Sequence, residues 1–259
     1  MASKKTRPQA NPPTQGARAP KPTQRLPAID ALRGLAILAM FAYHFAFDLN
    51  YFAVIRADFN HDWFWLTART LILSSFLALV GMSLALGHGG GFKPAPFLKR
   101  IGLLAGCAAL VSIGSYLIFP HSWIYFGVLH FILVASVLGL LALRFNWANL
   151  ALGAALIALG NSVKLPLFDM AWLNWFGLMT HKPVTEDYVP LLPWFGVVLI
   201  GIFLGRRVLD TSPSTALRRW QPTGSASRIL ALAGRHSLLL YMLHQPVFIG
   251  LLFLLVGRK

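Results

Sequence analysis

A succession of long apolar stretches constrains the fold of this 259-residue chain more than any other feature. A helix needs about 20 apolar residues to cross a bilayer, and each stretch is near that length. Backbone polar groups inside lipid must be satisfied within the segment itself, which favours helices. We therefore predict an all-α membrane bundle of about seven transmembrane helices, over residues 29–52, 64–86, 98–119, 123–143, 147–162, 189–206 and 236–256.

The composition supports this class, because 56% of residues are hydrophobic and only 12% are charged. A formal net charge of +15 is also typical of nucleic-acid-binding proteins. Short basic loops of a membrane protein produce the same excess, so we expect no nucleic-acid partner. Cys107 is the only cysteine, which excludes an intrachain disulfide.

Two further segments differ from the spans. Residues 1–26 are rich in Pro, Ala, Gln, Lys and Arg, and we predict a disordered basic cytoplasmic tail before a transmembrane domain at 27–259. Residues 167–179 form a shorter aromatic run, which suits an interfacial or re-entrant segment better than a crossing. An eighth span stays open on the sequence alone.

The distribution of charge predicts the orientation. With a cytoplasmic N-terminus, 17 of the 23 basic residues fall on the inner side, and six of the eight acidic residues fall outside. Lys and Arg are enriched in cytoplasmic loops, so this orientation is the expected one. The basic inner face needs no ligand to explain it, although it could also hold an anionic one.

Ionisable residues within spans are costly in lipid and therefore point to function. The first span carries three of them: at 100° per residue, Arg33 and His44 differ by only about 20° around the helix, and Asp48 lies one turn further. We expect Arg33 near the inner mouth and His44 in the outer half of the membrane.

His130 and His244 are predicted at a similar depth, so the three histidines could share one cavity, flanked by Gln245. Taken singly, His130 and His244 are more often hydrogen-bonded helix contacts than chemical groups. Gly127, Gly196 and Gly201 are expected to permit close helix packing.

Five ordered motifs carry a resemblance to a known family. They are Asp30-Ala-Leu-Arg33-Gly34 with Tyr43-His44, Gly81-Met-Ser83-Leu84, Tyr125-Phe-Gly127-Val-Leu-His130, Asp187-Tyr-Val-Pro190 through Gly196, and Gly234-Arg235 through His244-Gln245-Pro246. Together they resemble the bacterial members of the heparan-alpha-glucosaminide N-acetyltransferase catalytic-domain family. The likeness covers nearly everything after the tail.

The resemblance implies transfer of an acetyl or other acyl group from cytoplasmic acyl-CoA to an amine or hydroxyl of an extracytoplasmic sugar. It implies acetyl-CoA as donor, no metal, a glycan or amino-sugar acceptor, a multi-pass location in the inner (plasma) membrane, and a possible homo-oligomer. A neutral imidazole suits the proton transfer that such a reaction needs, so His44 is the first candidate base. Asp48 could orient it, or could instead pair with Arg69.

Further site residues follow from the same resemblance. His61 is the second candidate base, because the histidine of the eukaryotic members lies outside the first span. Arg33, Arg100 and Arg235 could hold the phosphates of CoA, and Gly34 would permit its close approach. Asp187 and Tyr188 join Asp169, Trp172, Asn174 and Trp175 as candidates for holding the sugar, and an aromatic belt at the membrane interface explains the same residues equally well.

Two other function classes remain open from the residues. His44, His130 and His244 could ligate haem or a metal in a membrane redox protein. A transporter of a small anion would also use intramembrane Arg and His residues.

Overall fold

The structure is a computed structural model that describes residues 25–210 and 216–257. All the regular secondary structure within these residues is helical, which confirms the all-α prediction. The predicted tail, residues 1–26, lies outside the described residues except for Arg25 and Leu26.

Seven apolar helices form the body of the molecule, and they coincide closely with the predicted spans. Five are long and apolar enough to cross a membrane, and α4 and α5 are shorter apolar helices. The α-helices are α1 Pro27–Tyr51, α2 Trp63–His88, α3 Pro94–Ile118, α4 Val128–Ala142, α5 Trp147–Ser162, α6 Leu191–Asp210, α7 Ala216–Arg219, α8 Ser225–Arg235 and α9 Ser237–Val256.

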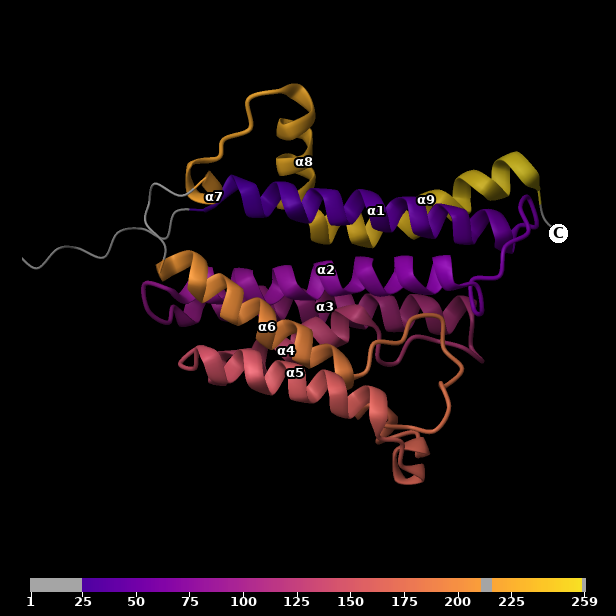
Figure 1. Ribbon diagram of the computed structural model, residues 1–259. Helices are drawn as coiled ribbons and strands as arrows, with labels where there is room; N and C mark the ends of the chain where they lie inside the picture. The colour runs from indigo at the N-terminus through magenta and orange to yellow at the C-terminus, as the bar shows by residue number, and fades with distance from the viewer. Residues whose placement is uncertain (1–24, 211–215, 258–259) are drawn as a thin grey trace, which may run out of the picture.

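The apolar helices run side by side, and the connections gather at the two ends of the bundle (Figure 1). We call one end the basic end, because α1 begins there and Arg33, Arg100 and Arg235 lie near it. The other is the loop end, where the longer connections 52–62, 119–127 and 163–190 lie.

The structure differs from the prediction in three places. Helix α4 begins at Val128 instead of residue 123, because the Asp187 carboxylate accepts a hydrogen bond from the Val128 amide, 2.8 Å away, and fixes the helix start there. Residues 167–179 contain no α-helix, only the short 3₁₀ turns η1 (Pro166–Asp169) and η2 (Asn174–Phe176), so no eighth span forms there. Helix α8 was not predicted at all.

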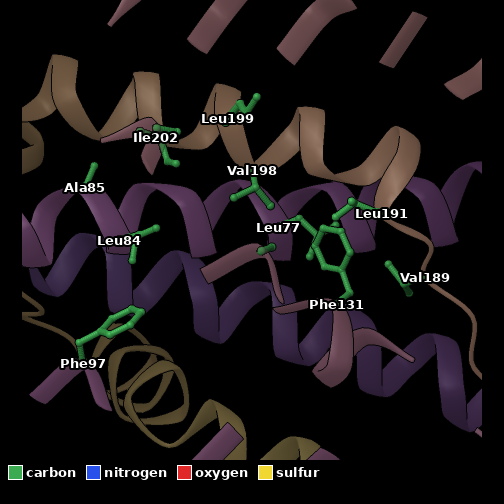
Figure 2. Close-up of a cluster of buried hydrophobic side chains, with 12 residues drawn as sticks. Leu77, Leu84, Ala85, Phe97, Phe131, Val189, Leu191, Val198, Leu199 and Ile202 are labelled. Atoms are coloured by element: carbon green, nitrogen blue, oxygen red, sulfur yellow. The ribbon is translucent and has the colours of Figure 1, made fainter. Parts of the chain in front are cut away.

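The best-packed part of the core lies where α6 contacts α2 and α4. Figure 2 shows Val198 and Ile202 of α6 facing Leu77 and Leu84 of α2, and all four are fully buried. Gly201 permits this contact, because a Cβ at that position would lie 2.2 Å from the Ala78 carbonyl oxygen. Gly196 and Gly153 permit a similar approach of α6 to α5. The predicted packing roles of Gly196 and Gly201 are confirmed, whereas Gly127 precedes α4 and lies against the Asp187 carboxylate and Ile124 instead of another helix.

Helix α8 lies across α1 near the basic end and stands away from the bundle axis (Figure 1). The two helices touch backbone to backbone. A Cβ on Gly34 would lie 2.0 Å from the Leu230 carbonyl oxygen, and a Cβ on Gly234 would lie 1.7 Å from the Asp30 carbonyl oxygen. Because α9 begins three residues after Gly234, this contact also positions the start of α9.

Candidate functional site

A cluster of four polar side chains lies between α1 and α9, in the half of α1 nearer the loop end. We call His44, Asp48, His244 and Gln245 the histidine cluster. The rings of His44 and His244 meet edge to face with their centroids 5.0 Å apart. The sequence predicted all four residues as site candidates, and the fold of α9 against α1 brings them together.

The tautomer of His244 follows from its hydrogen bond. Its Nδ1 lies 2.5 Å from the carbonyl oxygen of Tyr241, and a carbonyl can only accept, so Nδ1 carries the proton. In the neutral ring, Nε2 therefore holds a lone pair. That atom is buried and has no partner within the described residues. The ring is held in place by stacking on Phe41, 5.6 Å away between centroids.

Asp48 is only 3% exposed, and its partner is on α9. Its Oδ1 accepts a long hydrogen bond of 3.5 Å from Nε2 of Gln245. Within the described residues, neither the alternative ion pair with Arg69 nor a hydrogen bond to His44 is formed. The Oδ2 of Asp48 and the Oε1 of Gln245 are both buried without a partner.

Three unpartnered buried polar atoms thus lie in one small region: His244 Nε2, Asp48 Oδ2 and Gln245 Oε1. Nearly all buried polar groups in proteins are hydrogen-bonded, so each exception calls for an explanation. A place where several occur together is suited to binding a polar ligand or a reacting group.

His130 makes no ring contact or hydrogen bond with this cluster within the described residues, and one cavity shared by the three histidines stays a prediction. Both of its ring nitrogens are engaged near the start of α4. Nδ1 accepts from the Gly127 amide at 3.3 Å, and Nε2 lies 3.1 Å from the Ser112 hydroxyl. His130 therefore joins α4 to α3, which is the helix-contact role weighed for it from the sequence.

His61, the second candidate base, lies in the 52–62 connection. Its side chain is 85% exposed, and Nδ1 lies 2.9 Å from the Asp58 carboxylate. The Asn60 amide and the His61 ring hold the pKa of Asp58 below its usual value. The fold does not bring His61 and His44 into contact.

Near the basic end, one buried carboxylate forms ion pairs with three arginines. Asp30 is 3% exposed and lies 2.8 Å from Nε of Arg25, 3.1 Å from Nη1 of Arg33 and 3.5 Å from Nε of Arg235. Arg33 also donates to the Ser83 hydroxyl at 2.6 Å and to the Gly234 carbonyl at 3.2 Å.

Asp30 and Ser83 were part of the family motifs but were not named as site residues. The spacing of Asp30 and Arg33, three residues apart at the start of an apolar helix, is the signal that could have identified the pair.

The predicted CoA contacts meet different surroundings. Arg100 is half-buried near Arg33, close enough for the two like charges to repel, and has no ion pair within the described residues. Arg33 and Arg235 are shared with Asp30. The space beside Gly34 is filled by the backbone of α8, so Gly34 serves helix packing in this arrangement.

At the loop end, Asp187 links three segments. It accepts from the Val128 amide, interacts with the Tyr241 hydroxyl and lies against Gly127, where a Cβ would be 2.3 Å from its Oδ2. Burial raises the pKa of Asp187, against the opposing effects of the Val128 amide, Lys182 and Tyr241. Tyr188 donates its hydroxyl hydrogen to the Asn174 carbonyl.

Within residues 25–210 and 216–257, no three His, Cys, Asp or Glu side chains group in a way that could hold a metal ion. The rings of His44 and His244 contact each other directly, so a haem plane does not fit between them in this arrangement.

These features define an all-helical membrane protein with ionisable groups inside its bundle, and its sequence identifies the family. The chain matches the family model described as heparan-alpha-glucosaminide N-acetyltransferase, catalytic, over residues 25–246, and it belongs to that family. Members use acetyl-CoA as donor, so membership implies a membrane acetyltransferase. No curated protein and no solved structure matches the chain significantly.

Proposed function

We propose that the protein transfers an acetyl or other acyl group from cytoplasmic acyl-CoA to an amine or hydroxyl of an extracytoplasmic sugar, with His44 as proton acceptor. The observation that carries the proposal is the histidine cluster, an imidazole pair in which His244 Nε2 has no partner, together with the unpartnered buried oxygens Asp48 Oδ2 and Gln245 Oε1. In this proposal the basic end faces the cytoplasm of a cell whose inner (plasma) membrane the chain crosses.

The basic end offers a place for the phosphates of acyl-CoA. Asp30 offsets only one of the charges of Arg25, Arg33 and Arg235, and Arg100 adds another cation nearby. Guanidinium groups bind phosphate through paired hydrogen bonds. A phosphate group there would compete with Asp30 for Arg33 and Arg235.

The distance to the histidine cluster suits the donor. Arg33 and His44 are eleven residues apart on α1, about 16 Å along the helix, and nearly on one face. The extended pantetheine arm of CoA can cover such a span and bring its thioester to His44.

The reaction needs a base at that point. As the amine or hydroxyl attacks the thioester carbonyl carbon, it loses a proton, and the CoA thiolate leaves. A neutral imidazole can accept that proton. His44, whose ring makes no hydrogen bond within the described residues, is placed to do so, while His244, Asp48 and Gln245 orient the reacting groups. Asp187 and Tyr188 belong to the acceptor side.

The test is transfer of label from radiolabelled acetyl-CoA to membrane glycans or added glucosamine, using membranes with wild type, His44→Ala or His61→Ala. Loss of a general base costs about 10²–10⁴-fold in rate. We expect a loss of that size in His44→Ala and near-normal transfer in His61→Ala. Full activity in His44→Ala, with folding verified by an unchanged melting temperature, would refute the assignment.

A further inference from the structure

A hollow of about 490 Å³ lies at the loop end, apart from the histidine cluster. Its volume is within the range of small-molecule sites, about 300–1,000 Å³. None of the residues that line the hollow carries a formal charge at neutral pH. The lining residues are Trp123, Tyr125, Ala171, Trp172, Asn174 and Pro183.

Two residues that line this hollow each carry a buried polar atom without a hydrogen-bond partner. Asn174 is only 6% exposed, and its Oδ1 is buried without a partner, as is the hydroxyl oxygen of Tyr125. The Tyr125 hydroxyl lies close to the Asn174 side chain, but the contact does not have the geometry of a hydrogen bond, so neither oxygen has a partner. Buried acceptors left free in a hollow are suited to the hydroxyl or amide hydrogens of a ligand.

The walls of the hollow are held in place before any ligand binds. Thr185 donates to the carbonyl of Trp123 at 2.9 Å, and the Glu186 amide donates to the carbonyl of Ser122 at 2.9 Å. On the other wall, the Tyr188 hydroxyl donates to the Asn174 carbonyl. These bonds join the 119–127 and 163–190 connections into one preformed platform.

Aromatic faces complete the site. The side chains of Trp172 and Trp123 are 70% and 38% exposed, so indole surface is available to a ligand. Trp residues also collect at membrane interfaces, but an interfacial belt requires no unpartnered acceptors beside it. Aromatic rings together with a few convergent polar atoms match the C–H faces and hydroxyl groups of a sugar ring.

The hollow is also connected to the proposed chemistry. Tyr125 is two residues before Gly127, which Asp187 contacts, and Asp187 interacts with Tyr241 on α9. The carbonyl of Tyr241 in turn fixes His244. The platform that forms the hollow therefore touches the helix that carries half of the histidine cluster.

We propose that this hollow binds an uncharged pyranose ring of the acceptor glycan, with the ring stacked on Trp172, the more exposed of the two indoles, and its hydroxyls donating to Tyr125 and Asn174. The inference rests on the proposed function for the identity of the ligand as part of an acceptor. The uncharged lining favours a neutral sugar over a uronic acid.

Saturation-transfer NMR tests the proposal without any turnover. Full-length protein with His44→Ala, in phosphatidylcholine nanodiscs free of sugar detergents, is mixed with methyl N-acetyl-β-glucosaminide and, separately, with methyl glucuronide. We expect transfer to the ring protons of the neutral sugar and about tenfold weaker binding in Trp172→Ala, the effect of losing one stacking contact. Tyr125→Phe removes only the hydroxyl and should also weaken binding.

Trp147→Ala is the matched control, because Trp147 lies at the start of α5 near Arg207 at the opposite end of the bundle. It should bind like the parent protein. Equal binding in Trp172→Ala and the parent, or stronger binding of methyl glucuronide than of the neutral sugar, would overturn the proposal. No acyl-CoA is present, so sugar binding can persist even if acetyl transfer proves absent, and transfer can persist if this binding is lost.

Discussion

Three buried or partly buried aspartates differ in the charged and hydrogen-bonding groups around their carboxylates. Asp30 is surrounded by arginines, Asp48 has one long hydrogen bond to an amide, and Asp187 accepts from a helix amide while burial raises its pKa. A paired buried charge is costly to break, whereas a weakly paired one favours its neutral form. Asp187, which lies outside the membrane-spanning helices, therefore gives a direct prediction for pH dependence.

The raised pKa of Asp187 should make the folded protein less stable as pH rises. Its pKa is higher in the folded than in the unfolded protein, so between the two values the folded state binds more protons, and stability falls with increasing pH. The fall begins near the ordinary aspartate pKa of about 3.9 and is complete above the raised value. We expect Asp187→Asn to flatten this part of a plot of melting temperature against pH, by about 2–4 °C for each kcal/mol involved.

Asp169 provides a control of opposite sign. The hydrogen bond from the Thr180 side chain is the main cause that lowers the pKa of Asp169, and the Thr180 amide adds to it. The stability that Asp169 contributes is therefore present above its pKa in the unfolded protein and is lost as pH falls. Asp169→Asn should leave the decline at higher pH unchanged. A decline that persists in Asp187→Asn would assign it to another group.

Among the elements, α8 holds an unusual position, because it crosses α1 with backbone against backbone at Gly34 and Gly234. The same crossing brings Arg235 to Asp30 and the Gly234 carbonyl to Arg33. The position of α8 and the arginine network near the basic end therefore depend on each other.

Gly34→Ala tests this crossing. Its Cβ would lie 2.0 Å from a backbone oxygen of α8, so the helices must separate, and we expect a loss of about 1–3 kcal/mol. Gly106→Ala on α3 is the matched control, since its Cβ meets nothing within 4 Å and alanine favours a helix by up to about 1 kcal/mol. Thermal unfolding of both variants measures the difference. A Gly34→Ala protein as stable as Gly106→Ala would show that α8 is not fixed there.

The elements also show what the sequence can predict. Hydropathy located the seven apolar helices within a few residues, because length and composition alone determine which segments suit lipid. It placed the start of α4 five residues early, since Asp187, 59 residues away, sets that start. It missed α8, an 11-residue amphipathic helix whose buried face depends on contact with α1.

For the whole molecule, the sequence identified the members of the histidine cluster but not their partners. Helical spacing put Arg33, His44 and Asp48 on one face of α1, and only the packing of α9 joins His44 to His244 and Asp48 to Gln245. Likewise, helix periodicity could not separate His130, whose ring binds to Ser112 on α3. Local sequence patterns do not predict contacts between segments that lie far apart in the chain.

The bundle as a whole places an arginine group near one end and sugar-compatible side chains at the other, with the histidine cluster between them. In the proposed orientation, donor and acceptor approach from opposite sides of the membrane. This sidedness is the central claim, and it separates a transmembrane acyltransferase from an enzyme that works on one face.

The direct test uses sealed proteoliposomes whose protein orientation has been sorted by protease accessibility of the N-terminus. Radiolabelled acetyl-CoA is supplied only on the side of the N-terminus, and glucosamine only on the other. We predict labelled N-acetylglucosamine in the glucosamine compartment with wild type and none above background with His44→Ala. Labelled sugar that forms only when both substrates share one compartment would contradict the account.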